Sequence, residues 1–168
     1  MEDKSIVLIG FMGVGKTSIG TELAKKLQWG LIDTDERIEQ QFKMSTSKIF
    51  LDHGEEVFRK AESELIEQLS AEEKQILSLG GGAFLNSKNR EICLQNSTVV
   101  LIELSWEKWL DRYPLIKDTR PKLNGLSTDE MYHLYKERQA HYQPYHLKIN
   151  VDGKTAEEAA ELIISGIR

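Results

Sequence analysis

The sequence lacks the features typical of secreted, membrane and metal-cluster proteins. Its one cysteine, Cys93, excludes an internal disulfide and a cysteine-based zinc site. No apolar run approaches the roughly 18 residues of a membrane-spanning helix. Glu2 and Asp3 stand where a signal peptide would carry basic residues. We therefore expect a cytoplasmic protein with no membrane partner.

Basic residues are also fewer than acidic residues. The chain has 22 Lys and Arg against 27 Asp and Glu, a net charge of −5, which argues against binding to nucleic acid or an anionic membrane. Any anionic ligand must therefore be held by local positive charge. The length of 168 residues fits a single domain, residues 1–168, and we expect a monomer.

Short β-branched runs alternate with longer amphipathic stretches, a pattern that predicts βαβ units. We expect an α/β fold of three layers, with a central five-stranded parallel sheet flanked by helices. The expected strands are residues 5–9, 30–33, 75–79, 98–104 and 148–151. The expected helices are residues 16–27, 35–42, 55–69, 88–95, 106–112, 128–142 and 155–167, with caps expected at Ser87, Ser105, Ser127 and Thr155.

A phosphate-binding loop follows the first expected strand. It reads Gly10-Phe11-Met12-Gly13-Val14-Gly15-Lys16-Thr17. The glycines let backbone N–H groups converge on phosphate oxygens, Lys16 reaches the β- and γ-phosphates, and Thr17 offers its hydroxyl to Mg²⁺. The loop predicts that the chain binds a nucleoside triphosphate.

Ligands of a parallel sheet lie beyond the carboxyl ends of its strands. Asp33 and Asp35 follow the second expected strand, where one carboxylate can orient Mg²⁺ through water and the other can bind an acceptor hydroxyl or remove its proton. The alternative is structural: Asp33 caps a helix, and Asp35 is a favourable charge in its first turn.

The third expected strand ends in Ser78 and Leu79 and leads into Gly80-Gly81-Gly82. Three glycines let the backbone approach a ligand without obstruction by Cβ atoms, although they also suit a flexible turn. Ser78 is in place to hold a Mg²⁺-bound water.

Three arginines are candidates for local positive charge. Arg59 forms an i, i+3 pair with Glu62, which alone is an ordinary solvated ion pair. Arg120 lies in residues 113–126, which show no sustained period and read as a long loop, and Arg138 lies on the next expected helix. We expect a mobile lid at about residues 112–127.

Together these motifs resemble the shikimate kinase family. The resemblance covers about residues 4–151 and adds Arg120-Pro121 and the spacing of Arg138 and Tyr142 to the motifs above. It implies Mg²⁺-dependent transfer of the ATP γ-phosphoryl group to the 3-hydroxyl of shikimate, in the pathway to chorismate and the aromatic amino acids.

The resemblance also implies residue roles. Lys16, Asp35 and Arg120 would be catalytic, and Asp35 would also bind shikimate within a region of about residues 34–62. The other shikimate contacts would be Arg59, Gly81, Gly82 and Arg138, with Glu62 fixing Arg59. ATP would contact Gly13, Val14, Gly15, Lys16, Thr17, Ser18, Arg112 and Arg120. Thr17 would bind Mg²⁺ directly, and Asp33 and Ser78 would act through water.

Two alternatives stay open at this point. One is another kinase of the same fold, acting on gluconate or a nucleoside monophosphate. The other is a catalytically silent nucleotide-binding regulator, which would be expected to have lost Lys16, Asp35 or Arg120.

Overall fold

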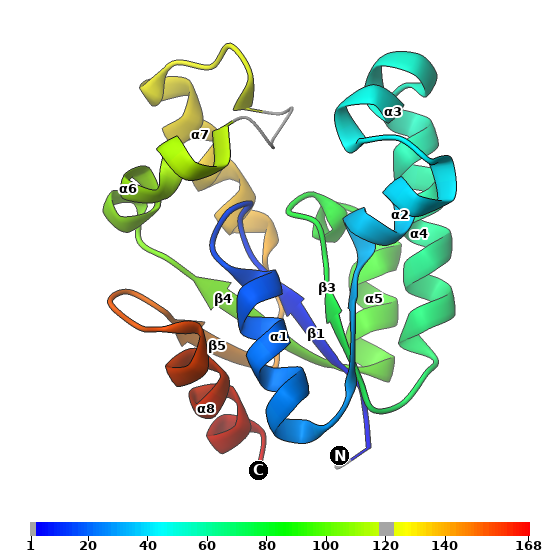
Figure 1. The fold of residues 1–168 in the computed structure, drawn as a ribbon, viewed down its shortest axis with the longest axis vertical. Helices are drawn as coiled ribbons and strands as arrows, with labels where there is room; N and C mark the ends of the chain where they lie inside the picture. Colours follow the sequence, from blue (N-terminus) through cyan, green and yellow to red (C-terminus); the bar gives the residue numbers. More distant parts are fainter. Residues whose placement is uncertain (1–2, 118–122) are drawn as a thin grey trace.

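The computed structural model describes residues 3–117 and 123–168, which form one sheet with helices on both faces (Figure 1). All strand pairs are parallel, in the order β2-β3-β1-β4-β5. The strands are β1 (Ile6–Ile9), β2 (Gly30–Asp33), β3 (Gln75–Ser78), β4 (Thr98–Glu103) and β5 (Leu147–Asn150). The expected α/β fold with a five-stranded parallel sheet is confirmed.

The helices form two layers around this sheet. On one face, α1 (Lys16–Leu27) packs against α8 (Ala156–Ile167), and α4 (Glu55–Ser70) and α5 (Ser87–Asn96) pack together on the other (Figure 1). The remaining elements are α2 (Thr34–Phe42), α3 (Thr46–His53), the 3₁₀ helix η1 (Ala83–Leu85), α6 (Trp106–Ile116) and α7 (Thr128–His141).

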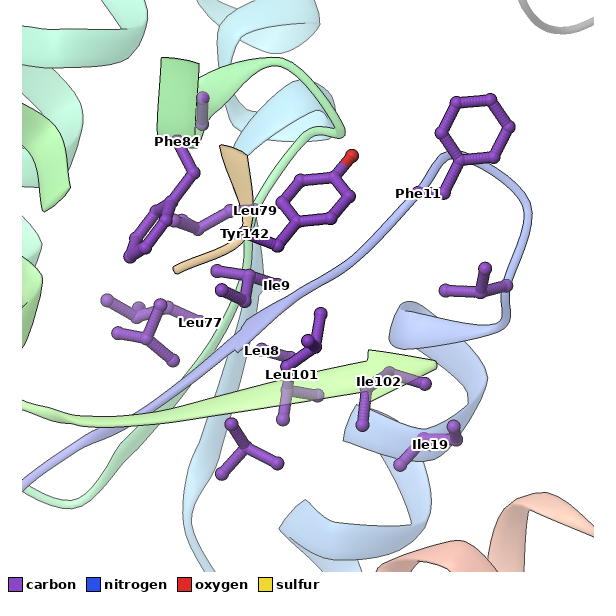
Figure 2. Close-up of a cluster of buried hydrophobic side chains, with 14 of the residues drawn as sticks. Leu8, Ile9, Phe11, Ile19, Leu77, Leu79, Phe84, Leu101, Ile102 and Tyr142 are labelled. Atoms are coloured by element: carbon purple, nitrogen blue, oxygen red, sulfur yellow. The ribbon is translucent and has the colours of Figure 1, made fainter. Parts of the chain in front are cut away.

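The core lies on both faces of the central strands. Every residue of β1 is buried, and so are all but the last of β4. Leu8, Leu77 and Leu101 come from three adjacent strands and lie in one apolar cluster (Figure 2). Each such side chain contributes about 1.5–3 kcal/mol when fully buried. This packing fixes the strand ends from which the candidate site projects.

Three expectations about local structure are wrong. Helix α3 was not predicted, because its eight residues bury only Ile49 and so carry little apolar periodicity. Helix α6 continues to Ile116 with Pro114 inside it, so the expected loop starts later. The cap of α5 is Asn86, whose Oδ1 accepts from two backbone N–H groups, and not Ser87.

Cys93 is buried in α5, and burial raises the pKa of its thiol to about 12. It is therefore a core side chain. Within the described ranges, no helix has both the length and the apolar composition needed to cross a membrane.

Candidate active site

The phosphate loop links β1 to α1 at the carboxyl edge of the sheet. Gly13 and Gly15 have φ of +80° and +103°, in the left-handed region that favours glycine. The Lys16 Nζ donates to the carbonyl oxygens of Gly10 (2.7 Å) and Phe11 (2.9 Å), and the residue is only 8% exposed. A cation and the N-terminus of α1 thus share one small volume, which suits a polyanion.

Three side-chain oxygens meet beside this loop. Thr17 Oγ1 donates to Asp33 Oδ2 at 2.6 Å and lies 3.2 Å from Ser78 Oγ. Strand register places Asp33 next to Ser78. The other carboxylate oxygen of Asp33 caps α2 by accepting from Glu36 N at 3.1 Å. Asp33 is therefore a helix cap and a site residue at once, since each oxygen has its own partner.

This oxygen group fits Mg²⁺. The ion prefers oxygen ligands, keeps several of its waters and is bound through few protein groups beside phosphates. Thr17 would supply a direct ligand, while Asp33 and Ser78 would hold its waters.

Asp35 lies against the glycines that follow β3. It lies in the first turn of α2, and its carboxylate packs against Gly80. A Cβ on Gly80 would come within 2.6 Å of Asp35 Oδ1. Glycine at this position therefore makes room for the carboxylate.

Arg59 and Arg138 converge beside Gly82. A Cβ on Gly82 would lie 2.5 Å from Arg59 Nη2 and 2.7 Å from Arg138 Nη1. Arg138 is 5% exposed, and its Nη1 donates to Gly81 O at 3.4 Å. Two guanidinium groups from α4 and α7 are thus brought together although 79 positions separate them in the chain, and such a pair suits a carboxylate.

Glu62 forms a hydrogen-bonded ion pair with Arg59. Its Oε1 accepts from Arg59 Nη1 at 2.9 Å, and the residue is 1% exposed. Burial raises the pKa of Glu62 to about 7; Asp35 adds to the increase, and Arg59 and Arg138 oppose it. The expected fixing of Arg59 by Glu62 agrees with this geometry.

Helix α6 supports the phosphate loop. Trp109 Nε1 donates to Met12 O at 2.7 Å, and Arg112 Nε donates to Gly13 O at 2.8 Å. One turn further on, the Ile116 side chain occupies the space that a Cβ on Gly13 would need. These contacts fix the carbonyls of Met12 and Gly13 in hydrogen bonds to α6.

A cavity of about 150 Å³ joins the two sides of the site. It is lined by Met12, Gly13, Gly15, Lys16, Thr17, Ser18, Asp33, Asp35, Ser78, Leu79, Gly80, Gly81, Arg112 and Ile116. Arg59, Gly82 and Arg138 lie beside this cavity without lining it. Val14, another expected ATP contact, is 2% exposed and does not line the cavity. The expected contact Arg120 lies outside the described residues.

Sequence reasoning missed Trp109, Ile116 and the bond from Tyr142 OH to Gly81 O at 2.7 Å. An indole and a phenol hydroxyl that are buried need hydrogen-bond partners. That rule marks Trp109 and Tyr142 as candidates, but the partner is fixed only by the fold.

Comparisons with known proteins identify the family of this chain. Residues 12–168 match the family model described as shikimate kinase. A shikimate kinase from Oceanobacillus iheyensis is 44% identical over 168 residues, with 100% of this chain and 92% of the relative covered. One from Bacillus subtilis is 43% identical, with 100% and 91% covered.

A solved structure of a shikimate kinase also has the same fold as this chain. The shikimate kinase from Acinetobacter baumannii, in complex with shikimate, matches with a TM-score of 0.92 and 31% identity, covering 98% of this chain and 92% of that one. The chain belongs to the shikimate kinase family of ATP-dependent phosphotransferases.

Proposed function

We propose that the site transfers the γ-phosphoryl group of ATP to the 3-hydroxyl of shikimate, giving shikimate 3-phosphate and ADP. The observation that carries this proposal is the convergence of Arg59 and Arg138 beside Gly82. A pair of guanidinium groups next to a carboxylate at Asp35 distinguishes an acidic polyol from a neutral sugar. Asp35 lines the same cavity as the phosphate loop, and the guanidinium pair lies beside it.

On the acceptor side, Arg59 and Arg138 bind the shikimate carboxylate, each through charge-assisted hydrogen bonds worth about 1.5–3 kcal/mol. Gly81 and Gly82 approach the ring through their backbone. Asp35 accepts a hydrogen bond from the 3-hydroxyl and takes its proton as the oxygen attacks phosphorus. The bond between the γ-phosphorus and the ADP oxygen then breaks.

On the donor side, residues 13–18 bind the phosphates through backbone N–H groups, the Lys16 ammonium and the Ser18 hydroxyl. Phosphoryl transfer asks the protein mainly for alignment and charge neutralisation. Thr17 would hold Mg²⁺ directly, and Asp33 and Ser78 would hold it through water; the bound ion would supply part of that charge.

Two arginines complete the donor side of the site. Arg120, which lies outside the described residues, closes over the phosphates from a lid that follows α6, and Arg112 lies against adenine. For Arg112, support comes from its position in the cavity lining and its bond to Gly13 O.

We also propose that the protein works as a monomer in the cytoplasm.

The test is ADP release with shikimate, gluconate and AMP measured in parallel at saturating ATP and Mg²⁺. We expect turnover with shikimate alone, with the product identified by mass as shikimate 3-phosphate. Turnover with gluconate or AMP and none with shikimate would refute the proposal. No turnover with any acceptor, despite ATP binding, would favour the silent regulator.

A further inference from the structure

We infer that Tyr142 is a positioning residue for the acceptor side: its hydroxyl holds the Gly81 carbonyl so that the N–H of Gly82 faces the acceptor substrate. This inference rests on the proposed function and deepens it. Tyr142 itself touches no reacting atom.

The Tyr142 ring is buried, and its hydroxyl is directed at one atom. The residue stands at the C-terminal cap of α7 and is 1% exposed. Figure 2 shows the ring among apolar side chains that include Leu79, with the oxygen at its outer end. Burial raises the pKa of this hydroxyl well above its ordinary range, and Arg138 opposes the increase only in part. The hydroxyl is therefore protonated at every working pH, and it donates to Gly81 O at 2.7 Å.

The hydrogen bonds of the three glycines use their carbonyl groups. Gly80 O accepts from Ala83 N at 3.1 Å, and Gly82 O accepts from Leu85 N at 3.2 Å. Gly81 O accepts from Tyr142 and, over a longer 3.4 Å, from Arg138. All three carbonyls are thus engaged by the protein. Within residues 3–117 and 123–168, no hydrogen bond uses the N–H of Gly81 or Gly82.

The geometry of the peptide bond links the direction of the Gly81 carbonyl to that of the Gly82 N–H. In a trans peptide, the C=O and the following N–H point in opposite directions. Holding the Gly81 carbonyl toward Tyr142 therefore directs the Gly82 N–H the other way. Gly82 itself packs against the Arg59 and Arg138 guanidinium groups, because a Cβ there would lie within 2.7 Å of both.

The hydroxyl is the part of Tyr142 that carries this role. A phenylalanine ring would fill the same apolar space and make no hydrogen bond. Only the longer bond from Arg138 would then restrain the Gly81 carbonyl, and glycine has no Cβ to limit its backbone. The Gly81 backbone also lies against the phosphate loop, because a Cβ on Gly81 would be 3.1 Å from Met12 N. The Gly82 N–H shares the peptide plane of the Gly81 carbonyl, so a loosened peptide would change the direction of that N–H and with it the acceptor side.

The experiment compares Tyr142→Phe with a matched control, Tyr135→Phe. Tyr135 lies on the same helix, and its hydroxyl also donates to a backbone carbonyl, Leu104 O, at 2.7 Å. We expect Tyr142→Phe to raise the KM for shikimate roughly five- to tenfold with the KM for ATP within about twofold, as loss of one buried hydrogen bond predicts. Tyr135→Phe should leave both KM values within about twofold of wild type.

The outcomes distinguish failure of the proposed function from failure of the positioning role of Tyr142. If wild type does not phosphorylate shikimate, the proposed function fails. If wild type does so and Tyr142→Phe keeps its shikimate KM, or raises the KM for shikimate and ATP equally, the positioning role is overturned. An equal effect in Tyr135→Phe would overturn it as well.

A second measurement needs no variant. Glycine-selective ¹⁵N NMR of the wild-type protein, which has 12 glycines, should show the amide signals of Gly81 and Gly82 shifting when shikimate is added without ATP. If neither signal shifts while shikimate binds, the inference is wrong, whatever the stability of Tyr142→Phe.

Discussion

Replacing Arg138 with alanine should weaken shikimate binding strongly and leave ATP binding intact. The guanidinium is almost fully buried beside Arg59, so its bonds to a carboxylate form in a partly desolvated place. At about 1.5–3 kcal/mol for charge-assisted bonds, and one factor of ten per 1.4 kcal/mol, the shikimate Kd should rise roughly tenfold to a hundredfold. Arg138 does not line the phosphate-side cavity, so the ATP Kd should stay within about twofold.

Isothermal titration calorimetry with each ligand measures both constants directly. Lys136→Ala is the matched control, because it removes an exposed positive charge from the same helix, where the ammonium lies 5.5 Å from the centre of the Tyr132 ring. It should leave both Kd values within about twofold of wild type. Unchanged shikimate affinity in Arg138→Ala, with a folded protein by thermal melting, would show that the carboxylate binds elsewhere.

Other substitutions test the remaining parts of the site. Asp35→Asn should keep the ATP Kd but lower kcat by roughly a hundredfold or more, as loss of a proton acceptor predicts; near-normal kcat in initial-rate assays would remove it from the mechanism. Gly82→Ala should raise the shikimate KM at least about tenfold, since its Cβ displaces both guanidinium groups, and an unchanged KM would contradict this packing. Folding raises the pKa of Glu62 from 4.5 to about 7, so its contribution to the free energy of unfolding is fully present below pH 4.5. That contribution should fall by about 3 kcal/mol as pH rises through 7. Urea unfolding of Glu62→Gln should lack this fall, and parallel pH profiles for the two proteins would refute the burial effect.

The phosphate loop could be predicted from sequence because its determinants are local. The positive φ angles at Gly13 and Gly15 require glycine, and Lys16 and Thr17 follow at fixed spacing. The grouping of Asp33 and Ser78 was also predictable, since both follow strands that end at the same edge of a parallel sheet.

The three glycines were only partly understood from sequence. They were expected to clear space for a ligand, but a large part of their role is to admit the protein's own side chains. Gly80 makes room for Asp35, and Gly82 makes room for Arg59 and Arg138. This close packing depends on helices distant in the chain, so no local pattern reveals it.

The supporting contacts could not be predicted because they join distant segments. Trp109 bonds to Met12 across 97 positions, and Tyr142 bonds to Gly81 across 61. Neither periodicity nor motif spacing encodes such a pair. The pairing of Arg59 with Arg138 was expected only because the ordered motifs resemble one family.

The central claim is that the phosphate loop and the arginine pair form the two halves of one site. A crystal structure with shikimate and a non-hydrolysable ATP analogue tests it most directly. We predict the shikimate carboxylate within hydrogen-bonding distance of Arg59 and Arg138, and its 3-hydroxyl between Asp35 and the terminal phosphate held at Lys16. A carboxylate bound away from both arginines, or a hydroxyl turned away from that phosphate, would contradict the account.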